Sequence, residues 1–182
     1  MLDERERGSE FPHRWLGAPR EWEGQVSHYS AAVSWDRGDA PFVDKRYSRA
    51  HVWNFDGGAV VRASSSPEAV PVPYSDPSGV DPEEAFVAAL ASCHMLWFLS
   101  IAAKDGFCVQ AYRDNAVGTL AANSRGKLCM TAVNLRPHAV FTSAKVPSPE
   151  AVREMHEEAH QQCYLANSVT TRLTTTPTFD IA

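Results

Sequence analysis

The chain has 182 residues, of which 44% are hydrophobic, and its formal net charge is −5. This length fits one domain with enough apolar residues to bury a core. Lys and Arg form no run longer than two residues, which argues against a nucleic-acid or anionic-membrane surface, because either requires clustered cations.

The N-terminus and the cysteines favour a single cytoplasmic domain. We expect residues 1–25 to be a loosely ordered extension and residues 26–182 to form one domain. The polar N-terminus lacks the apolar core of a secretory signal. Four cysteines, at positions 93, 108, 129 and 163, are widely spaced and form no CxxC pair. A secreted disulfide framework or a structural zinc site would pair them more closely.

The first part of the chain has the alternating pattern of half-buried strands. Asp56-Gly57-Gly58 supplies a tight hairpin between the second and third strands. A loop rich in Pro and Ser follows over residues 64–79. The predicted strands cover residues 28–35, 49–55 and 59–62.

A long apolar helix comes next. Asp81 is its predicted N-cap, Pro82 fits the first turn, and Glu84 completes a capping box. Residues 85–103 are apolar on nearly every side, so the helix should be buried all round. A membrane span is the alternative, since about 19 apolar residues approach the required length. The Ala-rich composition and flanking strand patterns favour a central helix enclosed by a sheet and a second subunit.

Strands and helices alternate in the remaining sequence. Gly106 ends the long helix, and Ser148-Pro149 begins a second helix. The other predicted elements are strands at 109–120 and 128–141, a short third helix at 164–170 and a last strand at 171–179. This order predicts an α+β fold with an antiparallel sheet packed on helices.

Cys93 and Cys163 are the candidate reactive residues. Cys93 lies inside the long apolar helix, where a cysteine is usually a small hydrophobic residue. Reactivity needs a nearby cation and some solvent access. The helix offers only His94 close to Cys93, and adjacent helical side chains point about 100° apart, so we expect His94 to serve packing or a subunit contact. Arg46 and Arg49, at the start of the second strand, are the candidate cations.

Three sequence segments together resemble the OsmC/Ohr family of thiol-dependent hydroperoxide reductases. They are Asp81-Pro82-Glu83-Glu84, Cys93 ten residues after Glu83, and Ala159-His160-Gln161-Gln162-Cys163. The resemblance covers roughly residues 28–181. It implies an OsmC-like α+β fold with antiparallel sheets packed on a long buried central helix, in an intertwined dimer.

The resemblance also implies roles for individual residues. Cys93 would attack the peroxide and become a sulfenic acid, and Cys163 would then form a disulfide with it, which an external dithiol reduces. Arg46, or alternatively Arg49, would stabilise the thiolate, and Glu83 would orient that arginine. The substrate would be an organic hydroperoxide, and neither a metal nor an organic cofactor is implied.

The chain departs from the family pattern near both cysteines. Tyr164 follows Cys163 where many members have proline, and His94 and Trp97 are larger than the usual residues after the reactive cysteine. The second strand is rich in aromatic residues. An apolar, aromatic-lined pocket would suit alkyl or lipid hydroperoxides better than hydrogen peroxide.

The spacing of Glu83 and Cys93 has a geometric consequence. Ten residues span about 15 Å along a helix, and the two positions do not share a face. Either an arginine bridges this gap or a second subunit supplies one member of the pair. Together with the all-round apolar helix, this favours a homodimer with sites at its interface.

Two other functions compete with the peroxidase interpretation. His156-Glu157-Glu158-Ala159-His160 matches the HExxH zinc motif, but after His160 only Cys163 or Asp180 could supply a third ligand. The chain could also be a stress or binding protein with vestigial thiols.

Overall fold

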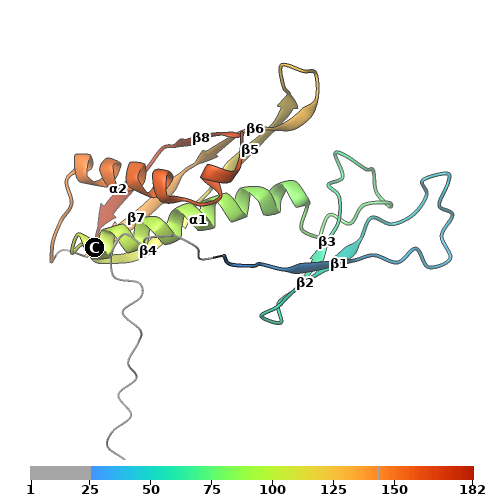
Figure 1. Cartoon of the computed structure of the whole chain (residues 1–182), viewed down its shortest axis with the longest axis horizontal. Coiled ribbons are helices and arrows are strands. Elements are labelled where there is room, and N and C mark those ends of the chain that lie inside the picture. The colour runs from blue at the N-terminus through green and yellow to red at the C-terminus, as the bar shows by residue number, and fades with distance from the viewer. Residues whose placement is uncertain (1–25, 143) are drawn as a thin grey trace, which may run out of the picture.

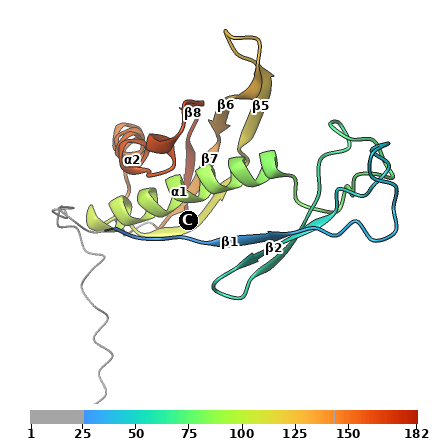
Figure 2. The ribbon, with the colours of Figure 1, turned by 45° about the vertical axis from the view of Figure 1, so that its right-hand side comes forward.

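The computed structural model describes residues 26–142 and 144–182, so the predicted extension over residues 1–25 lies outside the described residues. A small sheet stands at one end of the molecule, beside the start of a long helix (Figures 1 and 2). The rest is a layer of two helices packed on further strands. The α+β class expected from the sequence is thus present.

The small sheet is an antiparallel meander. It contains β1 (Ala31–Ser34), β2 (His51–Phe55) and β3 (Val60–Ala63), with β2 in the middle. The hairpin between β2 and β3 turns through Gly58, whose φ of +84° suits a residue without a side chain. All of β1 is exposed in the chain, so this sheet lacks the cover that a half-buried strand pattern predicts.

Helix α1 (Pro82–Lys104) begins at the capping box predicted from the sequence. The Asp81 carboxylate accepts the backbone N–H of Glu83 at 2.8 Å, and the Glu84 carboxylate accepts the N–H of Asp81 at 3.1 Å. These bonds satisfy donors that the first turn would otherwise leave unpaired. Gly106, with φ of +76°, follows the helix end.

Six strands form two neighbouring sheets, in the orders β4-β7-β9 and β5-β6-β8. Asp114 of β4 pairs with Pro137 of β7, and Val117 of β5 pairs with Asn134 of β6, so one hairpin continues from the first sheet into the second. The strands are β4 (Val109–Asp114), β5 (Val117–Ala122), β6 (Leu128–Leu135), β7 (Pro137–Phe141), β8 (Arg172–Thr175) and β9 (Thr178–Ile181).

The sequence predicted uninterrupted strands at 109–120, 128–141 and 171–179. This prediction was wrong, because each of the three segments is divided into two shorter strands. The breaks lie at residues 115–116, 136 and 176–177. Pro137 and Pro177 have no N–H to donate to a ladder. The Asp114 carboxylate accepts the Arg136 N–H at 2.7 Å and so satisfies it outside the ladder. The ladders are therefore interrupted at these residues, and the strands form two sheets.

The antiparallel sheets expected from the sequence also contain two parallel strand pairs. β8 runs parallel to β6, and β9 runs parallel to β7. Helix α2 (Pro149–Gln162) makes the crossover that a parallel pair requires. Ser148 caps α2 by accepting the N–H of Ala151 at 3.1 Å. The predicted third helix is only a 3-10 turn, Ala166–Ser168.

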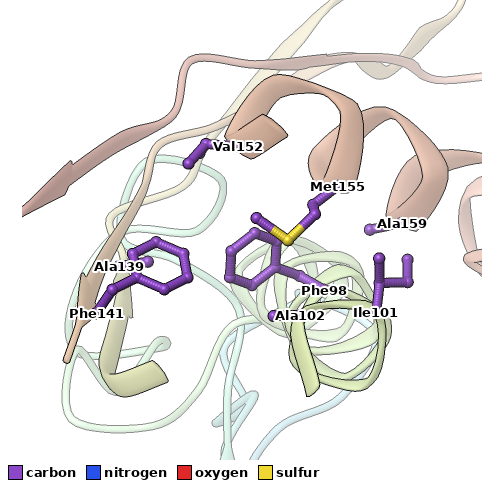
Figure 3. Close-up of a cluster of buried hydrophobic side chains, with 8 residues drawn as sticks. All are labelled: Phe98, Ile101, Ala102, Ala139, Phe141, Val152, Met155 and Ala159. Atoms are coloured by element: carbon purple, nitrogen blue, oxygen red, sulfur yellow. The ribbon is translucent and has the colours of Figure 1, made fainter. Parts of the chain in front are cut away.

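Two apolar clusters hold α1 to the rest of the chain. In the larger one, side chains from α1, α2 and β7 point toward one another (Figure 3). Its residues are Phe98, Ile101, Ala102, Ala139, Phe141, Val152, Met155 and Ala159. The smaller cluster places Leu90 of α1 against Val133 and Leu135 of β6. Helix α1 thus packs along its length on α2 and the larger strand layer.

One side of α1 is left uncovered by the single chain. The helix is long and apolar enough to cross a membrane by length and composition, yet it packs on α2 and on β4, β5 and β6 as a core helix does. Leu90, Phe98 and Ile101 are buried, whereas Leu96 is 64% exposed. The all-round burial predicted for this helix is therefore not supplied by one chain.

Candidate dithiol site

The two cysteines of the predicted site meet where α1 and α2 pack. Cys93 lies half-buried near the middle of α1, and Cys163 is the C-cap residue of α2 and is 1% exposed. Both are free thiols, and Cys93 lies close enough to Cys163 to raise the pKa of the Cys163 thiol. The structure thus brings together two sulfur atoms that are 70 residues apart in the sequence (163 − 93).

The surroundings of Cys163 keep it protonated. Burial, and then the neighbouring Cys93 thiol, raise the pKa of the Cys163 thiol to about 11. The backbone N–H of Ala166, in the 3-10 turn, donates to the Cys163 sulfur at 3.4 Å and acts in the opposite direction. Cys163 is therefore a neutral thiol near pH 7, held beside a more accessible cysteine.

An aromatic contact adjoins the two thiols. Trp97 lies one turn after Cys93 on α1, and Tyr164 directly follows Cys163. Their rings meet edge to face, with centroids 5.6 Å apart and an interplanar angle of 89°. Two of the positions at which this sequence departs from the OsmC/Ohr pattern therefore contact each other next to the dithiol.

The candidate arginines lie away from the dithiol in the single chain. Arg46 approaches Asp44 at 3.8 Å on the surface. The Arg49 guanidinium lies 3.9 Å from the centroid of the Tyr47 ring and donates to the carbonyl groups of Lys45 and Tyr47. Within the described residues, neither arginine contacts Glu83 or Cys93. Both belong to the connection between β1 and β2, which lies beyond the N-terminal end of α1 (Figures 1 and 2).

Glu83 is also separate from the dithiol. It is exposed in the first turn of α1, about 15 Å along the helix from Cys93. A hydrogen bond to the Asp81 carboxyl group, and then burial, raise the pKa of Glu83. The structure thus brings together Cys93 and Cys163 of the predicted site but not Arg46 or Glu83.

A pair of buried histidines, not predicted from the sequence, lies beside the dithiol. His94 of α1 is 1% exposed and His156 of α2 is 3% exposed, and their Nε2 and Nδ1 atoms are 2.9 Å apart. Burial, and then the proximity of His160, lower the pKa of His94 to about 4. Burial, and then His94, lower the pKa of His156 to about 3. Both imidazoles are therefore neutral near pH 7.

This pairing removes the geometric basis of the HExxH interpretation. His156 points toward His94, and the Glu157 carboxylate accepts the side-chain N–H of Gln161 at 3.2 Å. Among the residues that the structure describes, no three His, Cys, Asp or Glu side chains are arranged to hold a metal ion. The sequence pattern HExxH therefore arises here from a buried helix contact.

The fold and site define an α+β protein with a dithiol between its central helix and a crossover helix. The family model for OsmC-like proteins matches residues 75–178. An OsmC-like protein of unknown function from Vibrio cholerae is 53% identical over 84% of this chain and 100% of its own, with a TM-score of 0.82. The chain belongs to the OsmC-like protein family.

More distant structures share the fold. The organic hydroperoxide resistance protein of Elizabethkingia anophelis is 14% identical over 87% of this chain and 99% of its own, with a TM-score of 0.60. That of Bacillus subtilis is 18% identical over 83% of this chain and 98% of its own, with a TM-score of 0.57. No match was found among curated proteins.

Proposed function

We propose that this protein is a thiol-dependent peroxidase that reduces organic hydroperoxides to alcohols. The observation that carries the proposal is the proximity of the Cys93 and Cys163 thiols. Structural relatives named as organic hydroperoxide resistance proteins support the substrate class. This proximity also fits the order of events, because the more exposed Cys93 meets the peroxide and the buried Cys163 waits as a thiol.

The reaction proceeds in three steps. The Cys93 thiolate attacks the O–O bond of the hydroperoxide, which gives a Cys93 sulfenic acid and an alkoxide that takes a proton to become the alcohol. The Cys163 sulfur then attacks the sulfenic sulfur. A disulfide forms, and the departing hydroxide combines with the proton lost by Cys163 to give water. An external dithiol finally reduces the disulfide and is itself oxidised to a disulfide.

A homodimer is part of the proposal. In the single chain, the arginine candidates and Glu83 lie apart from Cys93, and one side of α1 and the strand β1 are exposed. A second copy that laid its small sheet over this side of α1 would cover both surfaces. This second copy would also bring its own Arg46 toward the dithiol of the first chain. There the Arg46 guanidinium would stabilise the Cys93 thiolate, and Glu83 would orient the guanidinium.

Mass analysis after peroxide treatment tests the function. Wild type, Cys93→Ser and Cys163→Ser proteins are reduced, freed of reductant and given one equivalent of cumene hydroperoxide. We expect a Cys93–Cys163 disulfide in the wild type and a dimedone-reactive sulfenic acid on Cys93 in Cys163→Ser. If both cysteines of the wild type stay reduced in excess hydroperoxide, the peroxidase proposal is wrong.

A further inference from the structure

The His94–His156 pair is a second direct link between α1 and α2. The 2.9 Å contact joins side chains that are 62 residues apart in sequence, and the His156 ring also stacks on Phe98 with centroids 4.1 Å apart. His94 directly follows Cys93, and His156 lies two turns before Cys163. The imidazole pair and the thiol pair therefore connect the same two helices.

Packing alone does not account for two histidines at this place. Within the described residues, Nδ1 of His94 and Nε2 of His156 are buried without a hydrogen-bond partner. Burying a polar group without a partner is unfavourable, and two apolar side chains of similar size would avoid that penalty. The pair therefore provides something that a well-packed apolar contact would not.

A hydrogen bond fixes direction, whereas apolar packing does not. Around the histidines, Met155 and Ala159 of α2 contact α1 through apolar groups, which tolerate small shifts and rotations. The Nε2–Nδ1 bond weakens steeply when its length or angle changes. Because Cys93 lies near Cys163 while Phe98 lies near His156, α2 runs antiparallel to α1. The bond thus fixes how far α2 can slide or turn against α1.

We propose that His94 and His156 are positioning residues for disulfide formation, an inference that rests on the proposed peroxidase function. Their hydrogen bond holds the α2 C-terminus so that the Cys163 sulfur stays within reach of the Cys93 sulfenic acid. In the step that they assist, the S–S bond forms, the S–O bond of the sulfenic acid breaks, and the hydroxide and the Cys163 proton leave as water. Neither histidine touches the peroxide.

Step-resolved kinetics with substitutions at His156 test this role. In His156→Leu, we expect sulfenic acid formation on Cys93 to stay within about twofold of wild type and disulfide closure to slow on the order of tenfold or more, because small misplacements of reacting atoms are costly. Glu154→Gln, at an exposed position of the same helix, is the control and should close at the wild-type rate. Quenched samples would be trapped with dimedone and analysed by intact mass.

Two polar variants keep the test decisive if His156→Leu does not fold. In His156→Asn, the amide lies where Nδ1 of the imidazole was, so it still reaches Nε2 of His94. In His156→Gln, the added methylene moves the amide away from that position. We expect disulfide closure to be faster in the Asn variant than in the Gln variant.

The outcomes separate this inference from the proposed function. Wild-type closure rates in His156→Leu, or equal rates in the Asn and Gln variants, would overturn the positioning role and leave the peroxidase intact. If the wild type forms no Cys93–Cys163 disulfide and Cys163→Ser forms no sulfenic acid on Cys93, the function itself is overturned, and the positioning role with it.

Discussion

At the residue scale, the buried histidines make stability depend on pH. The pKa values of His94 and His156 are about 4 and about 3 in the folded chain, below the value of about 6.5 for an unfolded histidine. The unfolded chain therefore binds protons first as the pH falls. Their contribution is complete above about pH 6.5 and is lost progressively toward pH 4 for His94 and toward pH 3 for His156, by up to about 1.4 kcal/mol per pH unit for each histidine.

Urea unfolding between pH 7.5 and 4.5 measures this effect. We expect the free energy of unfolding to fall more steeply with decreasing pH in the wild type than in His156→Asn, which retains only one of the two histidines. His138→Asn removes an exposed histidine of β7 and should keep the wild-type slope. Equal slopes in the wild type and His156→Asn would show that the pair does not resist protonation.

The sequence alone brought out only part of the site. The residues named through the resemblance included Cys93 and Cys163, which the structure places close together. His94 was expected to serve packing or a subunit contact, and its partner was not foreseen, because a contact between residues 62 positions apart leaves no local pattern. The HExxH motif drew attention to His156, but the same spacing suits a zinc site and a buried helix face.

At the element scale, the start of α1 was predictable because capping is local. Asp81, Pro82 and Glu84 carry out the roles that their positions indicate. The strand interruptions were missed, although Pro137 and Pro177 were visible in the sequence. Each proline starts or precedes a short strand, and only the pairing across three segments shows that the breaks coincide. The parallel pairing of β8 with β6 and of β9 with β7 was also missed, since strand direction depends on the path of α2.

Gly79 is where the Pro- and Ser-rich loop returns to β3. A Cβ atom at Gly79 would lie 2.9 Å from the backbone carbon of Ala63 and 3.0 Å from the backbone nitrogen of Ser64. Because backbone atoms cannot rotate away, Gly79→Ala should lower the free energy of unfolding by about 1–3 kcal/mol. Gly57→Ala is the matched control, since a Cβ at that position would meet nothing within 4 Å. A Gly79 variant as stable as the Gly57 variant would contradict this account.

At the scale of the whole molecule, the single chain looks incomplete. Strand β1 is exposed along its length, and Leu96 projects from the open side of α1. The candidate arginines lie on the surface, away from the two thiols. A closed dimer with twofold symmetry would use each of these surfaces twice. It would also give the extended small sheet the cover that it lacks.

Mixed dimers test whether the arginine comes from the partner. Cys93→Ser and Arg46→Ala should each be inactive, but coexpression should restore about a quarter of wild-type activity, because half of the dimers are mixed and each holds one complete site. A mixture of Cys93→Ser with Cys163→Ser is the control. It should form no Cys93–Cys163 disulfide, since both thiols of a site belong to one chain. A coexpressed Arg46→Ala mixture that stays inactive would contradict the shared site.

The most direct test of the central claim is to count alcohol molecules in a single turnover. Fully reduced protein without external reductant is given excess cumene hydroperoxide for a short time, and the cumyl alcohol formed per chain is measured by chromatography. The dithiol mechanism predicts one alcohol per chain in the wild type, with matching loss of both thiols, and none in Cys93→Ser. Equal alcohol from the wild type and Cys93→Ser, or none from either, would contradict it.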